Sequence, residues 1–457
     1  ADVAAQRKAP FSAQRPIVVE PDHGVDPVDF AAHLADLLQD LVRQHADEPA
    51  VGKAEAFDHS FADARLRAHV QHVGGERLVL FNARVRGQFE VRGRGHDVDG
   101  DSARFLVHLY EERRDLIFSE LNGWYNGLLL DMERGKAFLF NDRFGIRRIY
   151  YHESDAGFYF SSEAKSLLKV FPELRALRSE SVAEYLVYDA VLEDKSYFPG
   201  VSCLPPASAW VFEKGRPGPE RRSYLDVSRL ESQPPLGQSE FEEAFIGLFK
   251  GILPRYFRGG RVGMSLTGGL DTRLIMADRK PGPGELPCYT FGGKYRDIFD
   301  VRLAPRVAAI CGQDHHVLRL DDEAFLRDYP AHLARSIYVT DGIESVDKTD
   351  VMSFNRMARE VSPLRMSGKY GSQVLKNILG FQDRSPMAPL LSGEFAPELD
   401  SARQRCSALK RSHPFSFLQF KEIPWWWNGF IASESSQVSI RSPYLDNDLV
   451  ELLYRAP

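Results

Sequence analysis

The stretch that decides the fold is RVGMSLTGGLDTRLIM, which covers residues 261–276. Its apolar run from Val262 to Leu266 predicts a buried strand that ends at Gly268-Gly269 and is followed by an apolar helix. A glycine-rich turn at a helix N-terminus presents backbone N–H groups to an anion, and glycine lets the backbone approach a phosphate closely. The stretch therefore predicts a phosphate-binding loop. An ordinary connection between a strand and a helix is the alternative.

The side chains of this loop fit the same chemistry. The hydroxyl groups of Thr267 and Thr272 can donate hydrogen bonds to a phosphate, and the carboxylate of Asp271 can hold a magnesium ion. The loop lacks the Gly-Lys-Ser/Thr ending of the Walker motif. It resembles instead the Ser-Gly-Gly-x-Asp-Ser loop of enzymes that split ATP into AMP and pyrophosphate.

The composition is that of a multidomain globular protein. The chain has 457 residues, 43% of them hydrophobic, so two or three domains with sizeable cores are expected. A net charge of -6 gives no reason to expect a nucleic-acid partner. The sequence has no apolar stretch of about 20 residues, so no membrane partner is expected either. Scattered cysteines and the lack of a visible signal peptide are typical of a reduced, cytoplasmic protein.

The order of strand and helix patterns divides the chain into parts. Residues 1–60 are expected to form an N-terminal extension with an amphipathic helix. Residues 61–225 combine short antiparallel strands with helices, a mixture typical of a layered α/β sandwich. A linker is predicted over 226–240. Strands and helices alternate over 241–457, which predicts a doubly wound parallel sheet with its ligand at the carboxyl ends of the strands.

Hydrophobic periodicity predicts individual elements in both parts. In the first part, helices are predicted over residues 102–113 and 162–170. In the second part, the predicted strands cover residues 262–266, 288–291, 316–320 and 364–367, and the predicted helices cover 241–257, 272–278, 301–311 and 325–337.

Several further segments resemble asparagine synthetases. The segments LNGWYNGLLLD (121–131), NDRFGIRRIYY (141–151) and FSSEAK (160–165) are similar to the glutamine amidotransferase half of those enzymes, and RSPYLD (441–446) is similar to a signature of the synthetase half. The resemblance runs in the same order from about residue 64 onward. It implies an Ntn-type αββα sandwich followed by a doubly wound parallel-sheet domain that binds adenine nucleotide through a PP-loop.

The resemblance also implies an activity, that of an ATP-dependent carbon–nitrogen ligase that forms AMP and pyrophosphate. ATP and Mg²⁺ are then the expected cofactors. A carboxylate is activated as an acyl-adenylate, which ammonia or a substrate amine attacks. The carboxylate is left open among small molecules such as aspartate, a glycan acid and a peptide carboxyl. Family analogy alone suggests a homodimer.

The first half departs from the family pattern. A glutaminase of this class begins with a nucleophilic cysteine, whereas this chain begins with Ala1 and its first cysteine is Cys203. Arg84 stands where the family has the glutamate of a glutamine-binding Asn-Gly-Glu, although Asp101 resembles the second carboxylate. We therefore expect a retained sandwich that does not hydrolyse glutamine.

The resemblance assigns roles in the second half. Gln373 falls where an aspartate normally ligates magnesium, so the expected metal ligands are Asp271 and the neutral amide of Gln373. Lys369 is expected to neutralise pyrophosphate, with a solvated loop lysine as the alternative. The expected contacts to ATP are Leu266, Thr267, Gly268, Gly269, Asp271, Thr272, Phe291, Ser367 and Gly368.

Glu344 is the candidate general base for the attacking amine. It ends the segment TDGIE (340–344), which resembles the Asp-Gly-x-Glu region of β-lactam synthetases. The alternative is a surface loop residue. Trp425, Trp426 and Trp427 follow later in the chain and either pack a helix or form an aromatic wall of the acceptor pocket.

A second hypothesis belongs to a different class: a catalytically inactive binding or scaffolding protein on the same fold. Gln373 and the lack of an N-terminal cysteine favour it. A lysine that supports adenylation normally follows RSPYLD in the family, and we expect the sequence to be truncated before it.

Overall fold

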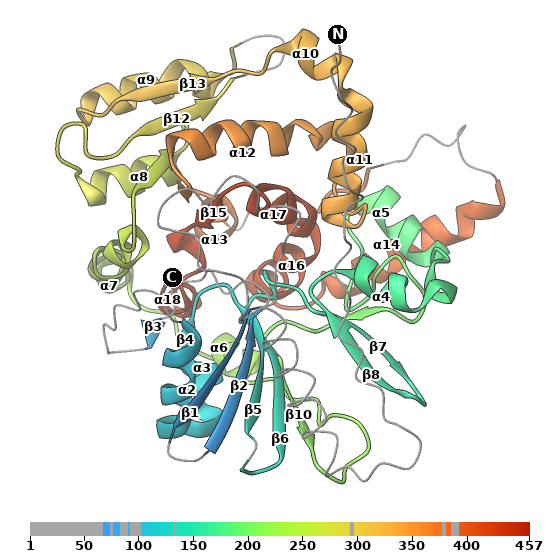
Figure 1. Ribbon diagram of the computed structural model, residues 1–457. Helices are drawn as coiled ribbons and strands as arrows, with labels where there is room; N and C mark the ends of the chain where they lie inside the picture. The colour runs from blue at the N-terminus through green and yellow to red at the C-terminus, as the bar shows by residue number, and fades with distance from the viewer. Residues whose placement is uncertain are drawn as a thin grey trace, which may run out of the picture.

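The computed structural model describes residues 67–73, 76–82, 90–91, 102–131, 133–292, 297–376, 381–384 and 393–457. The predicted N-terminal extension over residues 1–60 lies outside these ranges, as do Arg84 and Asp101. Figure 1 shows an antiparallel sheet at the bottom and a parallel sheet at the top. Helices α16 (Ile423–Trp426), α17 (Asn428–Ser435) and α18 (Asn447–Leu453) lie between them. The fold is therefore mixed α/β with a parallel sheet, as predicted.

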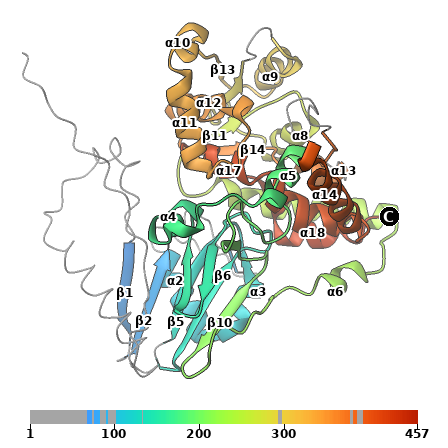
Figure 2. The same ribbon diagram turned by 90° about the vertical axis from the view of Figure 1, so that its right-hand side faces the viewer.

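The first half contains two antiparallel sheets, of which Figure 2 shows the larger after a quarter turn and Figure 1 shows strands β7 and β8 of the smaller. The larger has five strands in the order β1-β2-β5-β6-β10, and the smaller has the order β8-β7-β9. A short pair, β3 (Glu90–Val91) and β4 (Leu121–Asn122), lies apart from both. The bounds are Arg67–Val73 (β1), Glu76–Asn82 (β2), Asn126–Asp131 (β5), Lys136–Asn141 (β6), Tyr150–Ser154 (β7), Gly157–Ser161 (β8), Ser202–Cys203 (β9) and Ala209–Glu213 (β10).

Hydrophobic packing arranges this half in layers. Phe138 and Phe140 point to one face of the larger sheet, where helices α2 (Ser102–Arg113) and α3 (Ile117–Glu120) cover them. Leu139 points to the opposite face and packs with Trp210 and the smaller sheet, because successive side chains of a strand alternate between faces. Helix α4 (Ala164–Val170) packs on the far side of the smaller sheet. Both faces of strand β5 are buried, which explains its apolar run.

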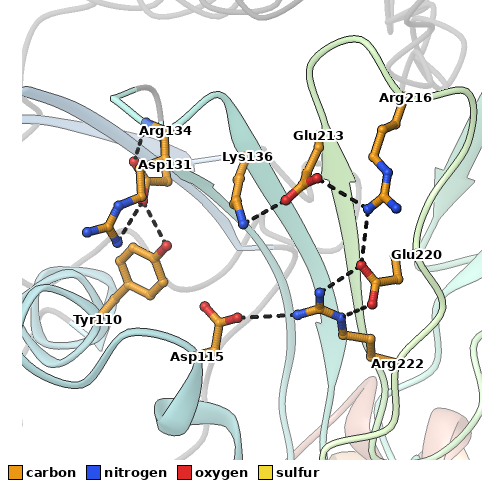
Figure 3. Close-up of polar contacts among 9 residues, drawn as sticks. All are labelled: Tyr110, Asp115, Asp131, Arg134, Lys136, Glu213, Arg216, Glu220 and Arg222. Atoms are coloured by element: carbon orange, nitrogen blue, oxygen red, sulfur yellow. Dashed lines mark hydrogen bonds and ion pairs between the residues drawn. The ribbon is translucent and has the colours of Figure 1, made fainter.

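Polar contacts hold the outer end of the larger sheet (Figure 3). The buried carboxylate of Asp131 accepts a hydrogen bond from the hydroxyl of Tyr110 at 2.8 Å, which fixes helix α2 to strand β5. Lys136 and Glu213 form an ion pair at 2.7 Å between strands β6 and β10. This second contact is more exposed, so we expect it to add little stability.

The second half is built on a parallel sheet of order β13-β12-β11-β14-β15. The chain leaves the central strand β11 toward β12 and β13 on one side, and later returns to β14 and β15 on the other side. In such sheets the ligand crevice lies where the order reverses, at the carboxyl end of the central strand. The bounds are Val262–Ser265 (β11), Cys288–Phe291 (β12), His315–Leu318 (β13), Leu364–Ser367 (β14) and Ser439–Arg441 (β15).

Helices connect and cover these strands. Those used below are α5 (Ser179–Tyr188), α7 (Gln238–Ile252), α8 (Leu270–Arg279), α9 (Phe299–Ile310), α12 (Asp350–Val361), α13 (Gly371–Lys376), α14 (Ala396–Leu409), α17 (Asn428–Ser435) and α18 (Asn447–Leu453). No helix in the described part of the chain is both long and apolar enough to cross a bilayer.

Three predicted elements differ from the structure. The helix predicted over 241–257 ends as α7 at Ile252, and Leu253–Phe257 form a 3₁₀ helix that contains Pro254. The helix predicted over 325–337 is two helices, α10 (Asp322–Arg327) and α11 (Tyr329–Thr340). Pro330 stands in the first turn of α11, and proline cannot continue a preceding helix because it lacks an N–H and its ring clashes with the turn before it. The predicted linker contains a short helix, α6 (Val227–Glu231), which the side chain of Asp226 caps by accepting the N–H of Ser228 at 3.0 Å.

The Asp-Arg-Phe-Gly segment joins the two halves. The buried carboxylate of Asp142 accepts the backbone N–H groups of Phe144, Ile146 and Arg147, which folds residues 142–147 into a tight loop. That loop directs Arg143 to Glu451 of helix α18 at 2.7 Å. The segment therefore has a structural role at the boundary between the halves.

A second contact between the halves centres on Asp446. Its buried carboxylate accepts hydrogen bonds from Asn122 of strand β4 at 2.8 Å and from the hydroxyl of Tyr256 at 2.9 Å. Asn447 adds a hydrogen bond to the carbonyl of Leu121 at 2.8 Å. These contacts fix the start of helix α18 relative to the first half.

Candidate active site

The predicted phosphate loop lies at the carboxyl end of strand β11 and at the N-terminus of helix α8, with Gly269 as the N-cap. The N–H of Thr267 is 3.3 Å from the Thr272 hydroxyl, and the N–H of Gly269 is 3.1 Å from the Thr267 hydroxyl. The N–H of Gly268 donates to the carboxylate of Asp300 at 2.8 Å. The structure thus brings the predicted loop residues together and adds Asp300 to them.

Asp271 lies in the first turn of helix α8, and one of its carboxylate oxygens lacks a hydrogen bond from any described residue. Its Oδ2 accepts a hydrogen bond from Ser372 of helix α13 at 2.9 Å. Its Oδ1 is buried and has no hydrogen-bond partner among the described residues, and the Nζ of Lys376 lies 3.9 Å away. A buried carboxylate oxygen without a partner is costly, and a bound cation relieves that cost. Asp271 therefore fits a magnesium ion.

Strand β14 places a second loop beside the first. Ser265 and Ser367 are partners in the register of β11 and β14, so Gly368 follows directly next to the phosphate loop. A Cβ atom at Gly368 would lie 2.9 Å from the Thr272 methyl group, and one at Gly371 would lie 2.6 Å from the Cβ of Asp271. Both positions therefore require glycine for this close approach.

The expected metal ligand Gln373 lies in helix α13. The hydrogen bond to Asp271 comes from its neighbour Ser372. The magnesium role of Gln373 stays a prediction, and Ser372 is a contact that the sequence pattern did not indicate.

The RSPYLD segment (441–446) hydrogen-bonds to the backbone of both the phosphate loop and the loop after strand β14. The hydroxyl of Ser442 donates to the carbonyl of Lys369 at 2.6 Å, and the hydroxyl of Tyr444 donates to the carbonyl of Asp271 at 2.6 Å. Both residues are buried. The segment therefore fixes the backbone of both loops.

A buried charge cluster lies beyond Gly368. Glu434 of helix α17 accepts a hydrogen bond from Arg365 at 2.7 Å and pairs with the Nζ of Lys369 at 2.9 Å. Arg365 also donates to Ser265 at 3.1 Å and to Asn355 of helix α12 at 2.7 Å. Arg365 and Glu434 thus tie strands β11 and β14 to helices α12 and α17.

Lys369 points into this cluster. Its Nζ lies 4.0 Å from the centre of the Phe430 ring and 4.7 Å from that of Trp427, and only 5% of its side chain is exposed. Burial lowers the pKa of Lys369 to about 8, although the charge of Glu434 acts in the opposite direction. Lys369 would have to leave Glu434 to reach a pyrophosphate, so its expected role stays a prediction.

Glu344, the predicted base, lies after helix α11 and against helix α17. A Cβ atom at Gly429 would lie 2.7 Å from the backbone nitrogen of Glu344, which shows how closely the two segments approach. Burial raises the pKa of Glu344 to about 8, and the charge of Lys369 opposes that rise. In the described part of the chain, its buried Oε2 has no hydrogen-bond partner. Glu344 is therefore a partly buried carboxyl group next to Lys369.

Phe291, one of the expected contacts to ATP, ends strand β12. Its ring packs on Phe354 with centroids 5.1 Å apart, and the guanidinium of Arg365 lies 5.0 Å from its centre. Trp425 packs in a separate core with Phe417 and Phe381. Trp427 contacts Tyr370 and Lys369 instead, so these two tryptophans have different surroundings.

Cys203 of the first half is not placed as a nucleophile. It is buried in strand β9, and burial raises the pKa of its thiol to about 11 despite the nearby Arg148. A nucleophilic cysteine needs the opposite shift. Within the described ranges, no cluster of three or more His, Cys, Asp or Glu side chains is arranged to hold a metal ion.

Sequence patterns missed Asp300, Arg365 and Glu434. Arg365 had a signal, because an arginine inside the apolar strand LRMS (364–367) needs a buried partner. Asp300 and Glu434 had none, because each looks like an ordinary polar residue of a helix.

Comparison with known proteins agrees with the predicted resemblance. Residues 78–224 match the family model of a glutamine amidotransferase domain. Asparagine synthetase 1 (glutamine-hydrolyzing) of Bacillus subtilis is 21% identical over 260 residues, which are 55% of this chain and 40% of that protein. A probable asparagine synthetase (glutamine-hydrolyzing) of Acanthamoeba polyphaga mimivirus is 22% identical over 304 residues, 65% of this chain and 49% of that protein.

The amidase chyE of Penicillium rubens is a further relative, 23% identical over 298 residues, which are 60% of this chain and 39% of that protein. The chain spans less than half the length of each of these three relatives. The amidotransferase match and the synthetase relatives show that the chain is similar to asparagine synthetases.

Proposed function

We propose that this protein is an ATP-dependent, AMP-forming amide ligase that does not hydrolyse glutamine itself. The observation that carries the proposal is the buried Oδ1 of Asp271 beside the Thr267–Gly269 loop, which has no hydrogen-bond partner among the described residues. This loop lies at the strand-order reversal of the parallel sheet, where such folds bind ligands. Relatives named as asparagine synthetases support the reaction class.

The residues around the loop fit ATP and magnesium. Thr267, Gly268, Gly269 and Thr272 would bind the phosphates through hydroxyl and N–H groups that exchange their present partners within the chain, and Asp271 offers an oxygen to the metal. Magnesium, when bound, supplies charge neutralisation for the displaced pyrophosphate. Leu266, Phe291, Ser367 and Gly368 are then expected to contact the nucleoside. In this proposal the second half is a PP-loop domain.

The proposed reaction has two steps. An oxygen of the substrate carboxylate attacks the α-phosphorus of ATP, and the bond to pyrophosphate breaks. The nitrogen of ammonia or a substrate amine then attacks the acyl carbon, and AMP leaves. Glu344 accepts the proton that the nitrogen loses, a role that suits a carboxyl group whose pKa is raised to about 8. The acceptor carboxylate belongs to a small molecule, a glycan or a peptide.

The first half supports the lack of glutaminase activity. Its helix–sheet–sheet–helix layers are those expected of an Ntn-type sandwich. Its cysteine Cys203 is buried, with a raised pKa. The nitrogen is therefore proposed to come from free ammonia or from an amine on the substrate.

One observation favours the second candidate, a non-catalytic binding protein. The three loop N–H groups at Thr267, Gly268 and Gly269 are already paired within the chain. Such a protein forms no AMP with any acid and amine, and this outcome separates the two candidates.

The test measures AMP and pyrophosphate release with ATP, magnesium and a panel of carboxylic acids, with hydroxylamine as a trap for acyl-adenylates. We expect release that depends on one class of acid, and a loss of at least about 100-fold in Asp271→Asn. Asp278→Asn, a charge-matched change at the other end of helix α8, should retain the activity. Equal rates in the wild type and Asp271→Asn would contradict the assignment of the loop.

A further inference from the structure

The N–H groups of Thr267, Gly268 and Gly269 in the phosphate loop donate to two different kinds of acceptor. Those of Thr267 and Gly269 point to hydroxyl oxygens, which can rotate and donate a hydrogen bond to an arriving phosphate. The N–H of Gly268 points to the carboxylate of Asp300, 2.8 Å away. A carboxylate accepts only, so it cannot turn into a partner for a phosphate. The carboxylate of Asp300 thus takes the place beside the Gly268 N–H that a phosphate would need.

The position of Asp300 is built into the fold. It lies in the first turn of helix α9, where a negative charge is stabilised by the helix N-terminus. The same turn packs against the loop, because a Cβ atom at Gly268 would lie 2.8 Å from Leu303 and 3.0 Å from Phe299. Helix α9 therefore holds Asp300 against Gly268.

We propose that Asp300 is an internal competitor for the phosphate, which makes the loop reject metal-free pyrophosphate and accept the magnesium-bound form. This inference rests on the proposed function. One N–H of Gly268 cannot serve a carboxylate and a phosphate at once, and the two anions repel each other at short range. Magnesium reduces the charge of the phosphates and hence the repulsion. Asp300 is in this sense a residue that determines specificity.

The test compares Asp300→Asn with Asp297→Asn by calorimetry. Asparagine keeps the size and the acceptor oxygen of Asp300 but removes its charge, so the fold and the Gly268 contact should persist. Asp297 lies three residues earlier and pairs with Arg319 at 2.5 Å on the surface, so its variant controls for the change in net charge. Pyrophosphate and ATP are titrated into each protein with magnesium and, separately, with EDTA.

We expect Asp300→Asn to bind metal-free pyrophosphate at least about tenfold more tightly than the wild type and Asp297→Asn do. The gain for magnesium–ATP should be smaller, so the preference for the metal-bound form falls. Equal preferences in both variants, with magnesium–ATP binding intact in the wild type, would overturn the role of Asp300 alone. No binding in any of the proteins, with or without magnesium, would overturn this role and the proposed function together.

Discussion

Two glutamates of this chain, the buried Glu184 and the partly buried Glu344, have opposite surroundings. Glu184 of helix α5 faces helix α14, where its carboxylate lies 2.5 Å from the Nζ of Lys195 and 3.1 Å from the Nε of Arg405. It also accepts the N–H of Leu192 at 2.9 Å. Glu344 lies beside helix α17 with a buried Oε2 that no described residue hydrogen-bonds.

The difference separates a glutamate that stabilises the fold, Glu184, from one that is placed to transfer a proton, Glu344. Burial raises the pKa of both carboxyl groups, but Lys195, the Leu192 N–H and Arg405 counteract it at Glu184, whereas Glu344 is raised to about 8. A buried charge with full pairing stabilises the contact between two helices. A buried carboxyl group without a partner costs stability and is available to exchange a proton, which is typical of reactive sites.

The largest effect is expected from a substitution of Glu344, the proposed base. Glu344→Gln should lower amide formation by about 10²–10⁴-fold, because the amine then loses its base. Pyrophosphate–ATP exchange driven by the acid should remain, since the first step does not use Glu344. Both rates are measured on the same preparation. A loss of both would mean that Glu344 supports the site as a whole rather than the second step.

The next prediction concerns pH. A base must be unprotonated to act, so the rate of amide formation should rise with pH and level off near the pKa of Glu344, which is about 8. Below that pH the rise should be about tenfold per unit. Glu344→Gln, measured with the same amine, controls for the titration of the amine itself. A wild-type profile that parallels the Gln variant would remove Glu344 from the proton transfer.

A substitution of Glu184 should change the stability of the fold instead. Glu184→Gln leaves Lys195 and Arg405 without their buried partner, and we expect a loss of about 2 kcal/mol in the free energy of unfolding. Glu180→Gln is the matched control, since Glu180 pairs with the same two cations but is 34% exposed. It should cost less than about 1 kcal/mol. Urea unfolding measures both, and equal losses would erase the distinction between the two sites.

The last prediction is a gain in stability, in contrast to the loss expected for Glu184→Gln. The folded-state pKa of Glu344 lies above its ordinary value of 4.5, so its contribution to stability is fully present below pH 4.5 and is lost as the pH rises through about 8. Glutamine does not ionise. Glu344→Gln should therefore stabilise the protein at pH 8.5 and change its stability by almost nothing near pH 4.5. Thermal unfolding at the two pH values shows whether the gain grows with pH as expected.

Much of the parallel sheet could be predicted from the sequence. Strands β11, β12 and β14 are short apolar runs between helical patterns, and this signal is local. Strand β15 escaped prediction, because its three residues, SIR, become a strand only through pairing with β14. The break at Pro330 was visible in the sequence, but the helical pattern around it concealed the boundary.

The site could be predicted only where its residues share one segment. Thr267, Gly268 and Asp271 stand within five residues of one another, so their spacing carries the chemistry. The partners of the remaining contacts are distant: Gly268 and Asp300 are 32 residues apart, and Arg365 and Glu434 are 69 residues apart. Such pairs are set by how strands and helices pack, which no local pattern of one sequence encodes.

The most direct test of the central claim follows oxygen from the acid to the nucleotide. The reaction is run with ¹⁸O-labelled carboxylic acid, ATP, magnesium and an amine, and the nucleotide product is weighed by mass spectrometry. The proposed acyl-adenylate predicts AMP that carries one ¹⁸O atom, because the acid oxygen bonded to phosphorus leaves with AMP. ADP as the product, or AMP without label, would contradict the account.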